Sequence, residues 1–220
     1  MASHTGPAHA QPRTRASKET RRTQLIEATL DAIAEKGLTA VTLADVADTA
    51  GLSRGIVNFH FVSKEKLLYA TLTHLSDEYD RNWHDGMIAA GPDAVDRMHA
   101  LISADLAETI CEPRKLAAWF GFFGAAASRP DYRDLCWARD DAYLNVLEDV
   151  CRALDTEAGY GIDPSKTAMA IYAMQEGLWL RLMLGSAELR RTDAIAIARG
   201  MLGTLFPDHF TPEGERRARG

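Results

Sequence analysis

Residues 42–68 read TLADVADTAGLSRGIVNFHFVSKEKLL, and this stretch decides the fold. Two short helical patterns flank a glycine, and a third helical pattern begins directly after them. This arrangement is typical of a helix-turn-helix, in which the second helix enters the DNA major groove and the first crosses the backbone. The stretch therefore predicts an all-α protein with a three-helix DNA-binding head over residues 18–68.

The order of residue types around the turn is specific for this motif. Thr42 is placed to cap a helix, Gly51 suits the tight turn, and Ser53 is placed to cap the next helix, over residues 54–60. Val46 and Ala50 are expected to face the core, with the small Ala47 at a close helix crossing. The pattern therefore predicts both helices and the turn between them.

The second helix of the motif supplies side chains suited to DNA. Arg can bond guanine through two hydrogen bonds and Asn can bond adenine, whereas glycine lets the backbone approach closely. The sequence therefore predicts base reading by Arg54, Asn58 and the backbone at Gly55. The full set predicted to contact DNA is Thr42, Ser53, Arg54, Gly55, Asn58, Phe59, His60 and Lys64.

Charge is unevenly distributed along the chain. The net charge is −6, but residues 13–69 hold nine of the 25 basic residues and only seven of the 31 acidic ones. Residues 1–17 are polar and non-periodic, so we expect a disordered basic arm that lies along the phosphate backbone or in the minor groove. The sequence thus predicts a mildly basic head on an acidic body.

Several classes of protein are disfavoured by the sequence. We expect no membrane segment and no secretion signal, and the three widely spaced cysteines give no disulfide framework, so a cytoplasmic protein is the simplest prediction. No phosphate-binding loop, nucleophile elbow or HExxH motif is present. We therefore predict no catalytic residues, no metal ligands and no cofactor.

The remainder of the chain predicts a helical body over residues 69–206, followed by a tail over 207–220. A first helix is expected over about 18–36, and a long fourth helix from Ser63 to about residue 89. Further helices are expected over about 93–110, 114–128, 131–157, 165–187 and 192–205, giving about nine in all. The last two are apolar on more than one face, which predicts burial against a second subunit.

Aromatic residues and acids accumulate in the predicted body. Aromatic faces beside a carboxylate suit an organic cation, through cation–π attraction of about 0.5–2 kcal/mol. Each residue taken alone is better explained as an ordinary core residue, whereas the group together predicts a small-molecule cavity. The predicted effector-binding residues are Trp119, Phe122, Phe123, Trp137, Asp141, Tyr172, Glu176 and Trp179.

Residues 20–68 resemble the DNA-binding domain of the TetR family of one-component regulators. The residues that carry the resemblance are Gly37, Thr42, Val46, Ala47, Ala50 to Ser53, Gly55, His60, Phe61, Lys64, Leu67 and Leu68. A weaker similarity to the BetI type is carried by three segments: RRTQLIEATLDAI near the start of the head, GIVNFHF, and the segment around Trp119. That resemblance implies a choline-like effector and a dimer in which the last two helices form a four-helix bundle with their copies.

One position departs from the family pattern. Where the family commonly has a tyrosine or histidine that donates a hydrogen bond to phosphate, this chain has Phe59. The resemblance therefore implies that Phe59 packs instead, and that the phosphate contact falls to His60 and Lys64.

The leading hypothesis is a homodimeric repressor on a palindromic operator, released by a small molecule. One alternative is a TetR-like activator or global regulator without a small ligand, whose aromatic residues are core. A further alternative, from another class, is an all-helical enzyme or scaffold with a fortuitous helix-turn-helix.

Overall fold

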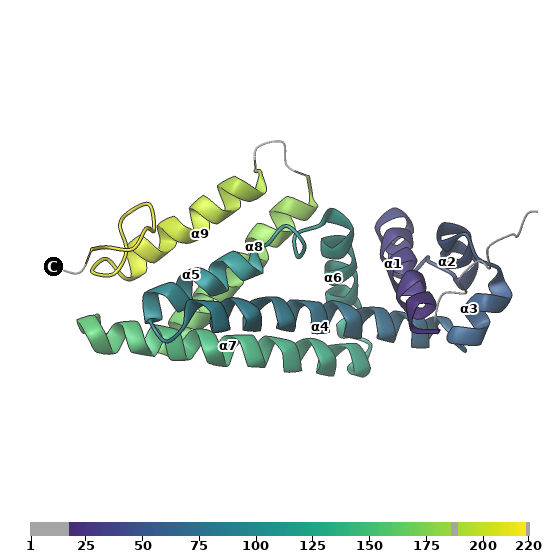
Figure 1. The fold of residues 1–220 in the computed structure, drawn as a ribbon, viewed down its shortest axis with the longest axis horizontal. Coiled ribbons are helices and arrows are strands. Elements are labelled where there is room, and N and C mark those ends of the chain that lie inside the picture. The colour runs from purple at the N-terminus through teal and green to yellow at the C-terminus, as the bar shows by residue number, and fades with distance from the viewer. Residues whose placement is uncertain (1–17, 186–188, 219–220) are drawn as a thin grey trace, which may run out of the picture.

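A computed structural model describes residues 18–185 and 189–218, and within them the chain is helical (Figure 1). The basic arm predicted over residues 1–17 lies outside the described residues. The helices are α1 (Lys18–Lys36), α2 (Leu43–Ala50), α3 (Arg54–His60), α4 (Lys64–Ala90), α5 (Ala94–Asp105), α6 (Pro113–Ala126), α7 (Pro130–Ala158), α8 (Pro164–Met183) and α9 (Arg191–Leu205). Nine helices in the described part agree with the all-α prediction.

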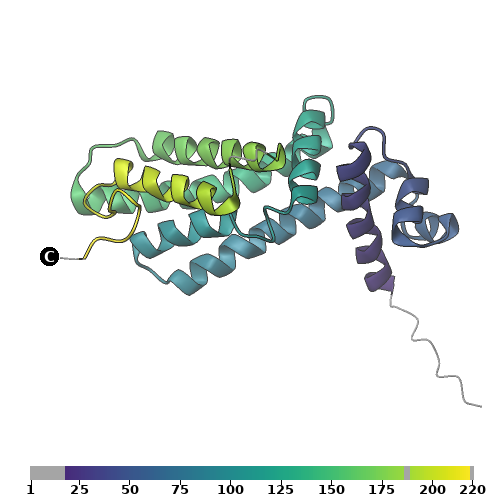
Figure 2. The same cartoon turned by 90° about the horizontal axis from the view of Figure 1, so that it is seen from above.

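Helices α1 to α3 form the head at one end of the molecule (Figures 1 and 2). Leu25, Leu30 and Ile33 of α1 are buried, and α1 packs against α2, which in turn packs against α3; Ala47 and Val57 are buried in these two helices. The predicted bounds of the three helices are confirmed. Thr42 and Ser53 cap the starts of α2 and α3, and Gly37 and Gly51 follow the ends of α1 and α2 with positive φ.

Helix α4 joins the head to the body. It leaves α3 in the head, runs the length of the body and packs there against α5 and α7 (Figure 1). Its buried stripe is Leu68, Leu72, Leu75, Tyr79 and Trp83, at the predicted steps of four, three, four and four. One rigid helix therefore belongs to both parts of the molecule.

The buried face of α7 agrees only in part with the apolar residues of this segment. Of its four aliphatic candidates, Leu147 and Val150 are buried, whereas Leu135 and Leu144 are only partly buried. The buried stripe follows Tyr132, Cys136, Arg139, Tyr143 and Leu147, at steps of four, three, four and four. The aromatic rings around the Arg139 guanidinium favour this face.

Two helices end earlier than predicted. Helix α5 stops at Asp105 rather than near residue 110, and the carbonyl of Asp105, which has no partner within the helix, accepts a hydrogen bond from Trp179 Nε1 at 3.0 Å. Helix α8 stops at Met183, and Gly185 follows in the left-handed region with φ 63°. A residue with positive φ ends a helix, and glycine adopts it without strain.

Residues 207–218, expected as a tail, fold back as a C-terminal hook on α5 and α9. Phe210 is fully buried and forms an isolated bridge with Arg216. The Arg216 guanidinium pairs with Asp93 at 2.7 Å and with Asp96 at 2.9 Å, at the start of α5. The hook therefore ties α9 to α5.

No helix within residues 18–185 and 189–218 is both long and apolar enough to cross a bilayer.

Candidate functional site

The start of α2 is fixed by a reciprocal pair of hydrogen bonds. Thr42 Oγ1 accepts from the Asp45 backbone N–H at 3.2 Å, and Asp45 Oδ2 accepts from the Thr42 backbone N–H at 2.9 Å. The ammonium of Lys36 and these Thr42 bonds lower the pKa of Asp45 to about 2. The predicted cap is confirmed, and it sets the angle at which α2 enters the head.

The turn and the cap of α3 also follow the sequence. Gly51 has φ 64°, and its N–H donates to the carbonyls of Ala47 and Asp48. Ser53 Oγ accepts from the Ile56 backbone N–H at 3.4 Å, and Val57 is fully buried. Val57 therefore anchors one face of α3 and fixes which residues point outward.

The opposite face of α3 is open. Arg54, Gly55 and Asn58 are all exposed, as the base-reading prediction requires. A Cβ added at Gly55 would meet only Ser53 Oγ, at 3.8 Å. Packing within the protein therefore does not explain the glycine.

The end of α3 differs from the prediction for Phe59. Its ring is 72% exposed, so the prediction that Phe59 packs is wrong. It contacts the edge of His60 at 5.2 Å, and the Lys18 ammonium lies 5.8 Å from its centroid. Lys64 Nζ donates to the Thr39 carbonyl at 2.7 Å. Phosphate contacts by His60 and Lys64 stay predictions.

Gly55→Ala is expected to separate folding from DNA binding. Alanine is the better helix former, so thermal stability should hold or rise by up to about 1 kcal/mol. Operator affinity should fall by about tenfold, the effect of one lost base contact, because the methyl group faces outward. Thermal unfolding and operator titration measure the two effects, and unchanged operator affinity would contradict close approach at Gly55.

In the body, four rings surround the guanidinium of Arg139. We call Tyr79, Trp119, Phe123 and Trp179 the aromatic cage. From the Arg139 Cζ atom the ring centroids lie at 4.3 Å for Trp119, 4.9 Å for Tyr79, 5.4 Å for Phe123 and 6.0 Å for Trp179. All four distances are within the range of cation–π attraction. The cage is built from α4, α6 and α8, and it encloses a side chain of α7.

The acids near Arg139 are partly buried. Arg139 Nε donates to Asp140 Oδ1 at 2.8 Å, and its Nη2 donates to the Tyr172 hydroxyl at 2.7 Å. The Tyr172 hydroxyl in turn donates to Asp140 at 2.7 Å. Glu176 is half-buried next to this group, and burial together with the charge of Asp140 raises its pKa. The cage thus borders two carboxylates.

A third carboxylate lies behind the cage. Asp105 is fully buried, and its Oδ1 accepts from the Tyr79 hydroxyl at 2.9 Å. Its Oδ2 has no hydrogen-bond partner within the described residues. Burial raises the pKa of Asp105 to about 7, against the Tyr79 bond and the Arg139 charge, which lower it. Asp105 is therefore partly protonated near neutral pH.

The predicted effector residues do not all meet. Trp119, Phe123 and Trp179 are in the cage, and Tyr172 and Glu176 border it. Phe122 is buried but packs against Tyr132, with ring centroids 5.2 Å apart. Trp137 is 59% exposed under Arg133, and Asp141 is exposed. Both lie on the outer face of α7, away from the buried stripe that contains Arg139.

Arg139, Tyr79 and Asp105 were missed as site residues. The sequence holds a signal for Arg139, since it lies at helical spacing with Tyr132, Cys136 and Tyr143. This signal was not used, because aromatic and acidic residues alone were considered.

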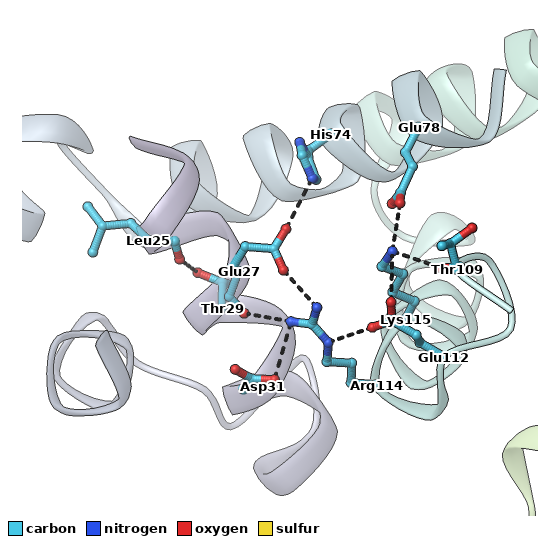
Figure 3. A network of polar contacts seen from close by, with 10 residues as sticks. All are labelled: Leu25, Glu27, Thr29, Asp31, His74, Glu78, Thr109, Glu112, Arg114 and Lys115. Atoms are coloured by element: carbon cyan, nitrogen blue, oxygen red, sulfur yellow. Dashed lines mark hydrogen bonds and ion pairs between the residues drawn. The ribbon is translucent and has the colours of Figure 1, made fainter. Parts of the chain in front are cut away.

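Helix α6 carries residues of the cage and also contacts the head, and Figure 3 shows its contacts with α1. Its first residues carry Arg114, which pairs with Glu27 at 2.8 Å and Asp31 at 3.3 Å, both on α1. A Cβ added at Gly121 would lie 3.2 Å from Leu38 Cβ in the head. The same helix supplies Trp119 and Phe123 to the cage, so a movement of α6 would reach both places.

The base of α6 is also tied to α4 (Figure 3). Lys115 is nearly buried, and its Nζ pairs with Glu78 at 2.7 Å and with Glu112 at 3.4 Å. Nζ also donates to the Thr109 carbonyl at 2.8 Å.

Among the described residues, no group of three or more His, Cys, Asp or Glu side chains is placed to hold a metal ion.

Two family models match the chain. Residues 25–71 match the model of bacterial regulatory proteins of the tetR family. Residues 94–207 match the C-terminal domain of BetI-type transcriptional repressors. The two matches fall on the head and on the body.

Individual proteins agree with these matches. The HTH-type transcriptional regulator BetI of Burkholderia lata is 31% identical over 192 residues, covering 86% of this chain and 95% of its own length. A putative transcriptional regulator of Pseudomonas aeruginosa PAO1 superposes with TM-score 0.75 at 26% identity, covering 88% of this chain and 94% of that one. A putative regulator of Saccharomonospora viridis in complex with choline shares the fold, with TM-score 0.71 at 20% identity over 82% of this chain and 94% of that one.

Proposed function

This chain belongs to the TetR family of transcriptional regulators and is a BetI-type repressor, and from this premise we propose that it acts as a homodimer on a palindromic operator and is released by a small organic cation. Each head would read one half-site, with the two heads about one DNA turn apart. The observation that carries the proposal is the open face of α3 beside the buried Val57 anchor. A cytoplasmic location follows from this function and stays a prediction.

A dimer through α8 and α9 is supported by their outward faces. The exposed residues of α8 at steps of four, four and three are Met169, Ala173, Gly177 and Leu180. Ile197 and Met201 are exposed on α9. Small and apolar side chains on adjacent helices suit close contact with a second copy.

An effector in the body is supported by the cage and by α6. The BetI resemblance implies a choline-like cation, and the aromatic rings and carboxylates fit that chemistry. A ligand that shifts α6 would act on the head through Arg114 and Gly121. The effect of such a ligand is limited by the difference between its affinities for the DNA-binding state and the released state. If no cation changes operator affinity, the alternative of a regulator without a small ligand is favoured.

The DNA-binding proposal predicts different losses at two residues of the head. Arg54→Ala should cost about 1–3 kcal/mol on the operator and relax its specificity, because Arg54 is proposed to bond a base. Lys64→Ala should weaken all DNA sequences alike and reduce the salt dependence, because Lys64 is proposed to contact phosphate. Mobility-shift titrations on the protein's own promoter and on unrelated DNA, at two salt concentrations, measure both.

The matched control is Lys166→Ala at the start of α8, an exposed lysine paired with Asp163 and outside the head. It should leave operator binding unchanged. Absence of any sequence-specific, salt-sensitive shift with the wild-type protein would overturn the proposed function.

A further inference from the structure

The aromatic cage already contains a cation of the chain itself. The Arg139 side chain is 3% exposed, and its guanidinium lies within 6.0 Å of four ring centroids. The rings belong to three helices other than α7, so the enclosure depends on the tertiary fold. A quaternary ammonium and this guanidinium would therefore occupy the same space.

Arg139 is held from one side. Its Nε and Nη2 bond Asp140 and Tyr172, whereas Nη1 has no hydrogen-bond partner within the described residues. A buried, charged donor without a partner loses hydration that nothing replaces. The buried position therefore stabilises the guanidinium less than a fully hydrogen-bonded site would. A change of rotamer of the flexible side chain would return Nη1 to water.

The charges around the cage favour a cation over an anion. Asp140, Glu176 and Asp105 all act electrostatically on this region, against the single charge of Arg139. The elements that face the guanidinium contribute Tyr79 from α4 and Tyr172 from α8, both neutral at pH 7 because burial raises their pKa values. With Arg139 displaced, the carboxylates would remain as partners for a different cation.

We propose that Arg139 is an intramolecular occupant of the effector site, and that a small quaternary ammonium ion binds the aromatic cage only by displacing it. This rests on the proposed function, because it assigns the specificity of the same effector site. A tethered competitor is present at high effective concentration. It lowers the apparent affinity by the fraction of molecules in which the cage is open. Arg139 thus sets the cation concentration at which the regulator responds.

Displacement also has a structural consequence. The guanidinium touches Trp119 and Phe123 of α6. The same helix contacts the head through Gly121 and through Arg114, whose pairs with α1 are drawn in Figure 3. Exchange of a planar guanidinium for a rounder ammonium changes what those two rings pack against. The exchange therefore occurs at the helix that touches the DNA-binding head.

The test compares three variants of Arg139 in calorimetric titrations with choline. Arg139→Gln removes the internal cation but keeps a donor for Asp140, and it should bind choline at least about tenfold tighter than the wild type. Arg139→Lys keeps a tethered cation and should show no such gain. Arg139→Ala should behave like Arg139→Gln. Arg133→Ala, which removes the exposed guanidinium 5.0 Å from Trp137 on the same helix, is the matched control and should not change the affinity.

The neutral analogue 3,3-dimethylbutan-1-ol has the shape of choline without its charge. The variants should gain affinity for choline and not for this alcohol. An equal gain for both compounds, or an equal gain in Arg139→Lys and Arg139→Gln, would show that only space was created and would overturn the proposal. Unchanged choline affinity in Arg139→Gln would overturn it as well.

A second measurement uses the wild-type protein and is independent of variant folding. Phenylglyoxal labelling read by mass spectrometry should spare Arg139 in the free protein and modify it at saturating choline. Protection of Arg139 in both states would overturn the proposal. Operator mobility shifts without choline report the proposed DNA-binding function separately, so the two failures are distinguishable.

Discussion

Replacing Gly177 by glutamate is expected to convert the proposed dimer into a 24.2 kDa monomer and to weaken operator binding by about 100-fold or more. Gly177 is exposed in the middle of α8, and a Cβ there would meet no atom within 4 Å of its own protomer. Glutamate is also the better helix former, by roughly 0.5 kcal/mol. The substitution therefore leaves the protomer intact and places a charge only in the proposed interface.

Loss of the proposed dimer should weaken DNA binding, because a dimer carries two linked heads that bind the two halves of a palindrome together. Light scattering gives the mass, and a mobility shift gives the affinity. Gly124→Glu is the matched control, since Gly124 is an exposed glycine of α6 that also has open space around it. A Gly177→Glu protein that keeps twice the protomer mass would show that α8 does not form the interface.

Replacing Asp105 by asparagine is expected to remove a pH dependence of stability. An aspartate in the unfolded chain has a pKa of about 3.9, whereas burial raises the pKa of Asp105 to about 7 in the native state. Between these values the native state binds a proton that the unfolded state does not. The wild-type free energy of unfolding therefore falls as pH rises from about 4 to 7, and the loss is complete above 7.

The magnitude follows from the separation of the two pKa values. At pH 8 the Asp105→Asn protein should be more stable than the wild type by up to about 4 kcal/mol, and near pH 4 the difference should vanish. The asparagine oxygen can still accept from the Tyr79 hydroxyl, so this hydrogen bond is retained. Urea unfolding at several pH values measures the difference. A constant difference across pH would mean that Asp105 does not titrate in this range.

The head could be predicted from the sequence because its determinants are local. Thr42 caps a helix that begins at the next residue, and Ser53 does the same for α3. Gly51 supplies the positive φ exactly where the chain must turn. Each helix boundary depends on residues within one helical turn, so the local sequence is enough to predict it.

The body site could be predicted only in part, because it depends on the rotation of one helix among its neighbours. Leu135 and Leu144 lie nine residues apart on opposite faces of α7, and the stripe that enters the core is the one that contains Arg139. A buried guanidinium is favourable only when rings from three other helices surround it, which no local pattern reveals. The aromatic set predicted from the sequence contains Trp119 and Trp179, which lie in the cage, and Trp137, which lies exposed on the other side of α7.

The C-terminal hook also orders events during synthesis. Arg216 pairs with Asp93, the residue that caps α5. Arg216 is translated about 120 residues after Asp93, which corresponds to a delay on the order of ten seconds. The caps of the head are complete once α4 has begun to emerge from the ribosome. The nascent chain can therefore hold a formed DNA-reading head well before its body is closed, and only translation through the hook completes the packing of α9 on α5.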